Sequence, residues 1–401
     1  MAMLGAVLLL LTLSAAYYLY TPIPVNIQEP WRLMMLDASL RTIRHVESMS
    51  KWLGLISVNT TLLNHLVPTD TNARPGLKFS DITLAGVPVR VYEPLGGGEG
   101  HLRRAVMFFH GGGWAIGSAK SGAFNDLCQT MSYELNAVVV SVDYRLYPVV
   151  FPEPYLDCLA VAKHLLSHEV LAQYSIDPDR VGVAGDSAGG NLAAAVAQEI
   201  SQDDTVTVKF RLQALVYPAL QALDFNTPSY LDSHNVPPAY RSAMIKFWLQ
   251  YLGAGVSKQQ AAMKNHHSAA DKVPPEMWAR VDWASLLPAK FKKNHKTVRV
   301  QKSSLLKEVP ALLDVRASPL LASSEVLAKT PLAYILTAEH DILRDDGLMY
   351  ARRLQDAGVT VTSEYLEDGF HGCLSFVKGP LSFDVGKRAE KSYITWLQNN
   401  L

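Results

Sequence analysis

From about residue 79 to residue 396, short apolar runs alternate with amphipathic helical patterns along the chain. Apolar runs of about four to eight residues bounded by turn residues predict buried strands, and apolar positions that recur every three or four residues predict helices. Alternation of the two is typical of a mostly parallel sheet with helices on both faces. The hydrophobic pattern therefore predicts an α/β fold.

Two segments interrupt this alternation. Residues 26–78 contain no strand pattern, and residues 224–313 form a long, basic, tryptophan-containing stretch with few strand signals. We predict that both are cap elements, mainly helical, which cover one edge of the sheet. Trp114, in a glycine loop described below, and Phe247 and Trp248, with Tyr251 beside them, are candidate walls of a substrate pocket. Ordinary helical packing explains the three cap aromatics equally well.

A possible catalytic turn lies at Gly185-Asp186-Ser187-Ala188-Gly189, between an apolar run and an alanine-rich helical pattern. The sequence Gly-x-Ser-x-Gly at such a place is typical of a nucleophile elbow, a sharp turn that exposes the serine hydroxyl. Its glycines leave room for a strained backbone, and the helix N-terminus behind the serine favours negative charge. An ordinary turn is the alternative, because these residues are common.

A second glycine-rich loop lies upstream. The apolar run 104–109 leads directly into His110-Gly111-Gly112-Gly113-Trp114. A loop of this type supplies backbone N–H groups to the oxyanion of a hydrolase, and the Ala188 amide after the nucleophile would complete the hole. A phosphate-binding loop is disfavoured, because neither the Gly-x-Gly-x-x-Gly spacing nor a following Lys-Ser/Thr pair is present.

An acid and a base follow two later strand patterns. The run 330–337 is followed by Asp341, and the run 359–366 is followed by His371, which lies in a glycine-flanked loop. Sites in α/β sheets form where the carboxyl ends of the strands meet. We therefore predict that His371 takes the proton of Ser187, and that Asp341 fixes the histidine tautomer.

Other residues compete for these roles. His340 adjoins the predicted acid and would point away from it. Asp345 and Asp346 suit the first turn of the following helix, where carboxylates are favourable. Asp186 suits local hydrogen bonding within the elbow better than a place in the triad.

Together these motifs resemble the hormone-sensitive-lipase group of α/β-hydrolases. The resemblance rests on residues 110–114, 143–148, 185–191, 341–347 and 369–372, and it extends over nearly the whole chain. It implies an α/β-hydrolase fold with a mostly parallel eight-stranded sheet and a catalytic triad of Ser187, Asp341 and His371. The oxyanion hole would consist of the loop that begins at His110, through the amides of Gly111 and Gly112, together with the amide of Ala188.

The resemblance further implies a cofactor-free enzyme of the endoplasmic reticulum that hydrolyses arylacetamides and esters. One departure is Tyr147, where the group often has alanine before the proline. This difference would reshape the pocket wall and leave the chemistry unchanged.

The N-terminus predicts a membrane anchor. Residues 1–28 contain no charged side chain, and residues 3–20 are almost continuously apolar. At about 1.5 Å per residue this run would extend roughly 27 Å, and Tyr17, Tyr18 and Tyr20 suit the membrane interface. We therefore predict a single transmembrane signal-anchor over residues 1–22, followed by a hydrolase domain over residues 23–401. A cleaved signal peptide is the alternative, but the basic residues that precede such a core are missing.

The orientation of this anchor is less well defined. Arg32, Arg41 and Arg44 follow the apolar run, which favours a cytosolic body. Asn59 begins the sequence Asn-Thr-Thr, a candidate glycosylation site that requires a lumenal body. The resemblance implies a type II protein with its catalytic domain in the lumen.

Composition narrows the remaining possibilities. The 401 residues are 49% hydrophobic and carry zero formal net charge, with no basic run, which argues against nucleic-acid binding. The cysteines, Cys128, Cys158 and Cys373, are odd in number and define no pairing. No acidic residue or cysteine lies at ligand spacing from His266-His267, so we expect no metal.

The sequence thus predicts a serine hydrolase of carboxylic esters and amides that works through an acyl-enzyme. Lipophilic substrates that partition into a membrane are expected, including xenobiotics, with neutral acylglycerols or cholesteryl esters as the alternative. An acyltransferase and a catalytically silent interaction domain are the competing classes.

Overall fold

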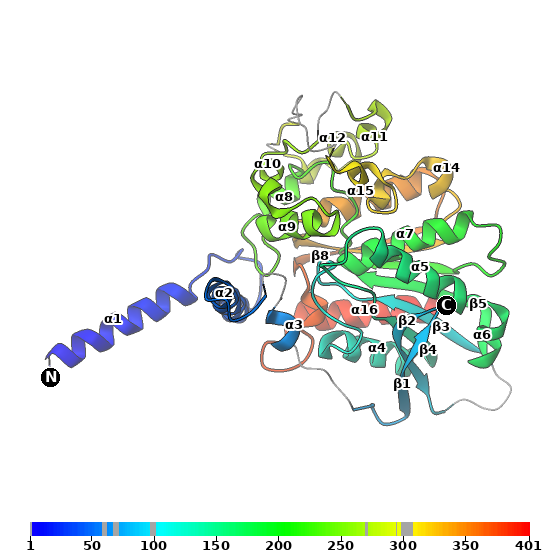
Figure 1. Ribbon diagram of the computed structural model, residues 1–401, viewed down its shortest axis with the longest axis horizontal. Coiled ribbons are helices and arrows are strands. Elements are labelled where there is room, and N and C mark those ends of the chain that lie inside the picture. Colours follow the sequence, from blue (N-terminus) through cyan, green and yellow to red (C-terminus); the bar gives the residue numbers. More distant parts are fainter. Residues whose placement is uncertain are drawn as a thin grey trace.

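Eight strands form one sheet in the order β1-β2-β4-β3-β5-β6-β7-β8 (Figure 1). The structure is a computed structural model that describes residues 2–57, 62–66, 72–96, 102–268, 272–293, 295–297 and 308–401. The strands are β1 (Leu77–Leu84), β2 (Val87–Pro94), β3 (Arg103–Phe109), β4 (Ala137–Val142), β5 (Ile176–Asp186), β6 (Leu212–Val216), β7 (Leu332–His340) and β8 (Val361–Phe370).

The sheet is parallel from β4 to β8 and antiparallel only where β1 and β2 join it. All six residues of β4 are buried, as are all five of β6. Strands buried on both faces are expected in a parallel sheet that helices cover on both sides. The predicted fold class is confirmed.

Alternate side chains of the strands supply two separate cores. On β3, Val106 and Phe108 pack with α4 (Gly122–Leu135) and α16 (Asp384–Asn400). Met107 and Phe109 face the other core, which contains α5 (Glu153–Leu165), α7 (Ala188–Gln202) and α15 (Arg344–Asp356). Two shorter helices, α6 (His168–Gln173) and α14 (Ser324–Leu327), lie in the connections. The period-two pattern of each strand therefore assigns its side chains to opposite helical layers.

A mainly helical cap lies between β6 and β7. It contains α8 (Pro228–Asp232), α9 (Arg241–Tyr251), α10 (Gln259–Met263), α11 (Pro275–Ala279) and α12 (Trp283–Leu286). Figure 1 shows these helices together at one end of the sheet. They occupy the segment in which the sequence shows few strand signals.

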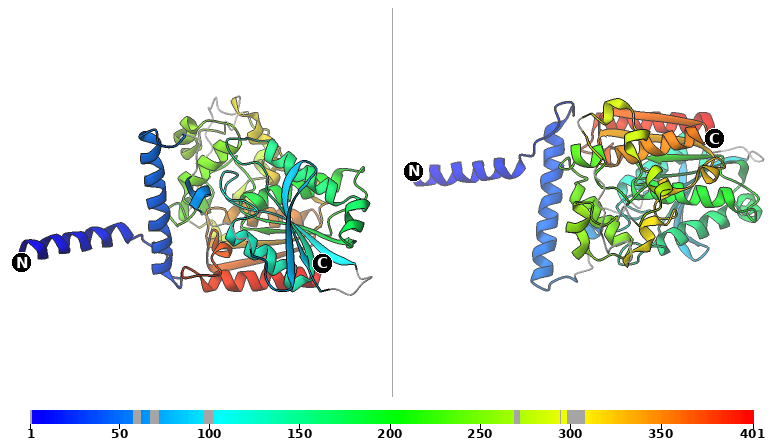
Figure 2. Two further views of the ribbon diagram at one scale, coloured as in Figure 1. Left: turned by 60° about the horizontal axis from the view of Figure 1, so that its bottom comes forward. Right: turned by 90° about the horizontal axis from the view of Figure 1, so that it is seen from above.

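The N-terminal segment forms α1 (Ala2–Leu19), α2 (Pro30–Trp52) and α3 (Leu62–Leu66). In both views of Figure 2, α1 projects from the body and α2 lies across one side of it. Within the described part of the chain, no helix has the combination of length and apolarity that crossing a bilayer requires. Asn59 lies outside the described residues. The three cysteines are free and buried.

Candidate active site

Ser187 lies in a sharp turn between β5 and α7. Its backbone has φ 53° and ψ −117°, a strained conformation for a residue with a side chain. A Cβ on Gly189 would lie 1.9 Å from the carbonyl oxygen of Phe109, and one on Gly185 would lie 2.4 Å from the carbonyl oxygen of Gly189. Both positions therefore require glycine, because main-chain atoms occupy the space of a side chain.

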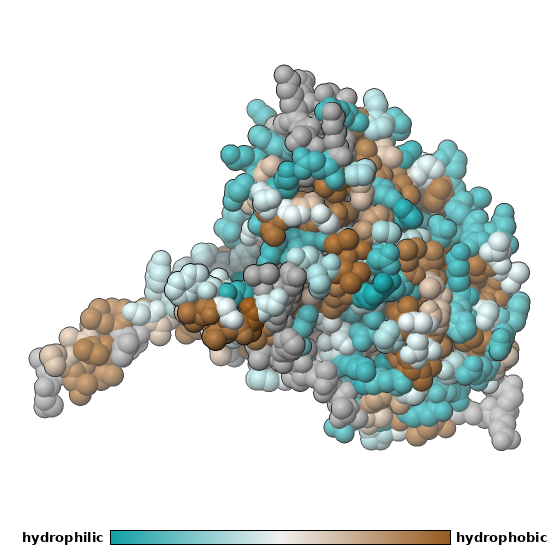
Figure 3. Space-filling model, in the orientation of Figure 1, coloured by the Kyte–Doolittle hydropathy of each residue, from teal (hydrophilic) through white to brown (hydrophobic). Residues whose placement is uncertain are grey.

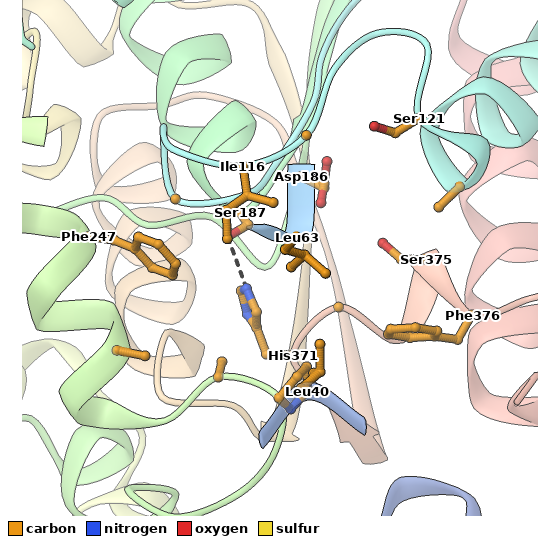
Figure 4. A pocket seen from close by; sticks show the side chains of 18 of the residues that line it. Leu40, Leu63, Ile116, Ser121, Asp186, Ser187, Phe247, His371, Ser375 and Phe376 are labelled. Atoms are coloured by element: carbon orange, nitrogen blue, oxygen red, sulfur yellow. Dashed lines mark hydrogen bonds between the residues drawn. The ribbon is translucent and has the colours of Figure 1, made fainter. Parts of the chain in front are cut away.

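The structure brings Ser187, His371 and Asp341 into one hydrogen-bonded chain. His371 Nε2 lies 2.9 Å from Ser187 Oγ, and His371 Nδ1 lies 2.9 Å from Asp341 Oδ2. Figure 4 shows the imidazole between the elbow and the loop after β8. Asp341 is fully buried after β7, and its other oxygen accepts a hydrogen bond from the Leu343 amide. This geometry is the one that proton transfer from a serine hydroxyl to an oriented imidazole requires.

The environment of His371 favours its protonated form. Burial opposes the imidazolium, but the charge and hydrogen bond of Asp341 outweigh burial and raise the pKa of His371 above its ordinary value. A charge-stabilising partner on the far nitrogen suits a base that becomes positive during the reaction.

The competing residues lie elsewhere or have structural partners. His340 Nε2 donates to the side-chain oxygen of Asn26. Asp345 accepts from the Ser229 amide, and Asp346 accepts from the Leu220 amide, so both fix the start of α15 to neighbouring loops. His267 is buried, with its Nε2 on the carbonyl oxygen of Ala222.

The glycine loop differs from the prediction in one respect. The Gly111 amide donates to Asp186 Oδ1 at 2.7 Å and is therefore not available to a substrate. His110 is also directed inward: it is buried, stacks on Tyr144, and its Nδ1 bonds the Gly111 carbonyl. These two residues position the loop and do not form the oxyanion hole as predicted.

The next two glycines, Gly112 and Gly113, donate their amides to no acceptor among the described residues. Gly112 and Gly113 line the cavity beside Ser187, with φ of 110° and 61°. Ala188 begins α7, where backbone N–H groups have no helical partner. The candidate oxyanion hole thus consists of Gly112, Gly113 and Ala188. The sequence signal that could have excluded Gly111 is the acidic residue before the nucleophile, whose carboxylate needs a donor.

A cavity of about 360 Å³ opens onto Ser187 and His371 (Figure 4). It is lined mainly by apolar side chains from α2, α3, α4 and α9 and from the loops after β3, before α9 and after β8: Leu36, Leu40, Leu63, Ile116, Ala123, Phe124, Pro238, Ala239, Ala243, Met244, Phe247 and Phe376. Both segments predicted to form a cap therefore contribute to it. The leucines of α2 and α3 are functional candidates that the sequence analysis did not name, although their apolar spacing was visible.

The three predicted pocket aromatics separate in the structure. Phe247 lines the cavity, where its ring covers Gly113. Trp114 and Trp248 are not among the residues that line it, and both are buried. Trp114 stacks on Tyr251 with ring centroids 4.2 Å apart, and Trp248 tilts against the same indole. These tryptophans join the cap to the sheet, and the prediction that they contact substrate was wrong.

Comparison with known proteins agrees with this geometry. A family model described as "alpha/beta hydrolase fold" matches residues 106–286 and 294–375. The chain therefore belongs to the α/β-hydrolase-fold family, and the resemblance drawn from its motifs is confirmed.

The relatives define the enzyme class more closely. The chain is 47% identical to bovine neutral cholesterol ester hydrolase 1 over 96% of its length and 97% of the relative's. It is 42% identical to rabbit arylacetamide deacetylase over 98% of both chains. Among solved structures, a bacterial heroin esterase covers 85% of this chain and 89% of its own with a TM-score of 0.61 and 25% identity. An esterase from Pseudomonas putida, with a TM-score of 0.62 and 27% identity, covers 84% of this chain and 87% of its own. The chain is accordingly a serine carboxylic-ester hydrolase.

Proposed function

We propose that the enzyme hydrolyses lipophilic carboxylic esters through an acyl-enzyme on Ser187. In this mechanism Ser187 Oγ attacks the ester carbonyl while its proton passes to His371 Nε2. The oxyanion forms against the amides of Gly112, Gly113 and Ala188, and His371 then protonates the departing alcohol. Water, deprotonated by the same imidazole, attacks the acyl-serine, and release of the acid returns the proton to Ser187.

One observation carries the proposal: the hydroxyl of Ser187, hydrogen-bonded to His371, faces a cavity whose walls are mainly apolar. Such walls stabilise hydrocarbon groups by removing them from water, by about 25 cal/mol per Å². Charged substrates would lose their hydration against these apolar walls. Lipophilic acyl or alcohol groups are therefore favoured.

Arylacetamides form a second candidate class. Phe124, Phe247 and Phe376 line the cavity, and rings of this kind favour an aryl group by edge or offset packing. The chain is similar to both arylacetamide deacetylase and neutral cholesterol ester hydrolase, which makes aryl amides and neutral lipid esters the two candidate substrate classes.

A substrate panel tests these proposals. We expect the purified enzyme to cleave 4-nitrophenyl hexanoate, to react with a fluorophosphonate probe, and to lose both properties in Ser187→Ala. Cholesteryl oleate and 4-nitroacetanilide then separate the two substrate classes. A wild-type protein that neither cleaves the hexanoate nor takes the probe would contradict the proposed function.

We also propose that the N-terminal segment attaches the enzyme to the membrane of the endoplasmic reticulum, with the catalytic domain in the lumen. Exposed apolar side chains on α1 support attachment, among them Met3 (82% exposed) and Leu10 (64%), and Figure 3 shows apolar residues over this helix. Deletion of residues 2–19 should move the enzyme from the carbonate-washed membrane pellet to the supernatant. Digestion with an endoglycosidase should lower the mass of the full chain but not that of Asn59→Gln. An unchanged distribution after the deletion contradicts attachment, and an unchanged mass contradicts a glycosylated lumenal body.

A further inference from the structure

One side of the catalytic cavity carries polar groups that the ester chemistry does not use. Ser121, Asp186 and Ser375 line the same cavity as Ser187. In Figure 4 their oxygen atoms point toward a common space, away from Phe247. We propose that these three side chains form a subsite for a hydroxyl group of the substrate, so that esters bearing a nearby hydroxyl are preferred. This inference rests on the proposed ester hydrolysis.

Ser121 is placed to cap a helix but does not do so. It precedes α4 with φ −61° and ψ 136°, the extended conformation of a helix-capping residue, and its side chain makes no capping hydrogen bond. The residue is only 5% exposed. Its hydroxyl has no hydrogen-bond partner within the described part of the chain and is directed into the cavity. A buried hydroxyl that forgoes its local partner is available to a ligand.

Asp186 supplies a strong acceptor at the same place. Asp186 Oδ1 accepts a hydrogen bond from the Gly111 amide at 2.7 Å, and no side-chain donor among the described residues bonds this carboxyl group. The residue is 5% exposed, and burial raises its pKa to about 7. A carboxyl group in an apolar cavity gains most from a donor that arrives with the substrate, because water there is replaced by hydrocarbon.

Ser375 completes the group from the opposite side. It ends the short helical turn Cys373–Ser375 that follows His371, and it is half-buried. A hydroxyl group on the substrate both donates and accepts hydrogen bonds. It can therefore donate to Asp186 while it accepts from Ser121 or Ser375. A methylene in the same place would give none of the three side chains a hydrogen bond from the substrate. Among common substituents of neutral lipophilic esters, a hydroxyl therefore matches the subsite best.

Two matched pairs of esters test this subsite. One pair, propyl hexanoate and 2-hydroxypropyl hexanoate, differs on the alcohol side, and the other, ethyl hexanoate and ethyl 3-hydroxyhexanoate, differs on the acyl side. In the wild-type enzyme we expect kcat/KM for the hydroxylated ester to be about tenfold higher in at least one pair, the effect of one well-placed hydrogen bond. In Ser121→Ala/Ser375→Ala the ratio should fall to about twofold or less, whereas Ser285→Ala, an exposed serine of the cap, keeps it.

The results distinguish failure of the hydroxyl subsite from failure of the proposed ester hydrolysis. No preference in either pair, or a preference that persists in the double variant, overturns the subsite while ester hydrolysis stands. Failure of the wild-type enzyme to cleave any of the four esters contradicts the proposed function itself. If the double variant does not fold, the single variant Ser375→Ala, in an accessible turn, gives the decisive ratio.

Discussion

His371 lies between a buried carboxylate and the nucleophile, and its titration should therefore control the acid limb of activity. Hydrolysis requires the neutral imidazole, so the rate should rise with pH through the pKa of His371, above the ordinary histidine value of about 6.5. Asp341→Asn removes the charge that raises this pKa. We expect the acid limb of kcat/KM to move to lower pH and kcat to fall by roughly 10⁴-fold. A limb that stays in place in Asp341→Asn would contradict the assigned pairing.

Asp186 should make the folded protein less stable as pH rises, whereas an ion-paired carboxylate makes a protein more stable as pH rises. Its pKa of about 7 in the folded protein exceeds that of an unfolded aspartate, about 3.9, so the native state loses stability as pH rises between these values. Asp186→Asn keeps the size of the side chain and removes the titration. We expect the urea midpoint of Asp186→Asn, relative to that of the wild type, to be higher at pH 8 than at pH 5. Equal differences at the two pH values would contradict the raised pKa.

Part of the site could be predicted from the sequence because it is encoded locally. Ser187 and the glycine loop each lie in a short motif, and the order of strands brings Asp341 and His371 to the same edge. The sequence shows that Asp186 needs a donor, but it does not show that this donor is the Gly111 amide, 75 positions away. Spacing along the chain does not reveal which of several adjacent amides a distant carboxylate engages.

At the scale of elements, the packing of α7 against β3 makes the elbow intolerant of any side chain. A Cβ at Gly189 would overlap the main chain of Phe109, which cannot move without breaking the sheet. We expect Gly189→Ala to lower the free energy of unfolding by at least about 3 kcal/mol. Gly96→Ala, where nothing lies within 4 Å of the added carbon, is the matched control and should change it by less than about 0.5 kcal/mol.

Neighbouring aromatics on α9 should have different effects when removed. Trp248 is fully buried, and Trp248→Ala should cost about 3–5 kcal/mol of stability. Phe247 faces the cavity, so Phe247→Ala should instead raise KM for an aryl ester about tenfold, with a smaller loss of stability. Chemical denaturation and ester kinetics on both variants measure the contrast. The same kinetic change in Trp248→Ala, without a loss of stability, would place that residue in the cavity after all.

The cap illustrates the limit of periodicity as a guide. Strand and helix alternation predicted the sheet because its central parallel strands, such as β4 and β6, are short, mostly apolar and fully buried runs. The helices of the cap are short, several of only four or five residues, and their aromatics are consistent with either core packing or a cavity. Only the direction of each helix relative to the sheet decides this, and that direction arises from contacts distant in sequence.

At the scale of the whole molecule, the N-terminal segment is tied to both the cap and the sheet. Asp37 of α2 is fully buried and accepts hydrogen bonds from Tyr240 before α9 (2.5 Å) and from Thr21 (2.7 Å). The side-chain amide of Asn26 donates to the Glu367 carbonyl oxygen of β8. Since α2 also supplies Leu36 and Leu40 to the cavity, these hydrogen bonds hold one wall of the cavity on the body of the enzyme.

The bond between Asp37 and Tyr240 should therefore contribute measurably to the stability of the whole chain. In a double-mutant cycle of Asp37→Asn and Tyr240→Phe, we expect a coupling energy of about 1–2 kcal/mol in the free energy of unfolding, because the acceptor of this part-buried bond is a fully buried carboxyl group. Tyr18→Phe combined with Tyr240→Phe is the control. Tyr18 bonds Thr42 at an exposed position, so this second cycle should be additive within about 0.5 kcal/mol. Equal coupling in the two cycles would mean that α2 is held on the body by its apolar face alone.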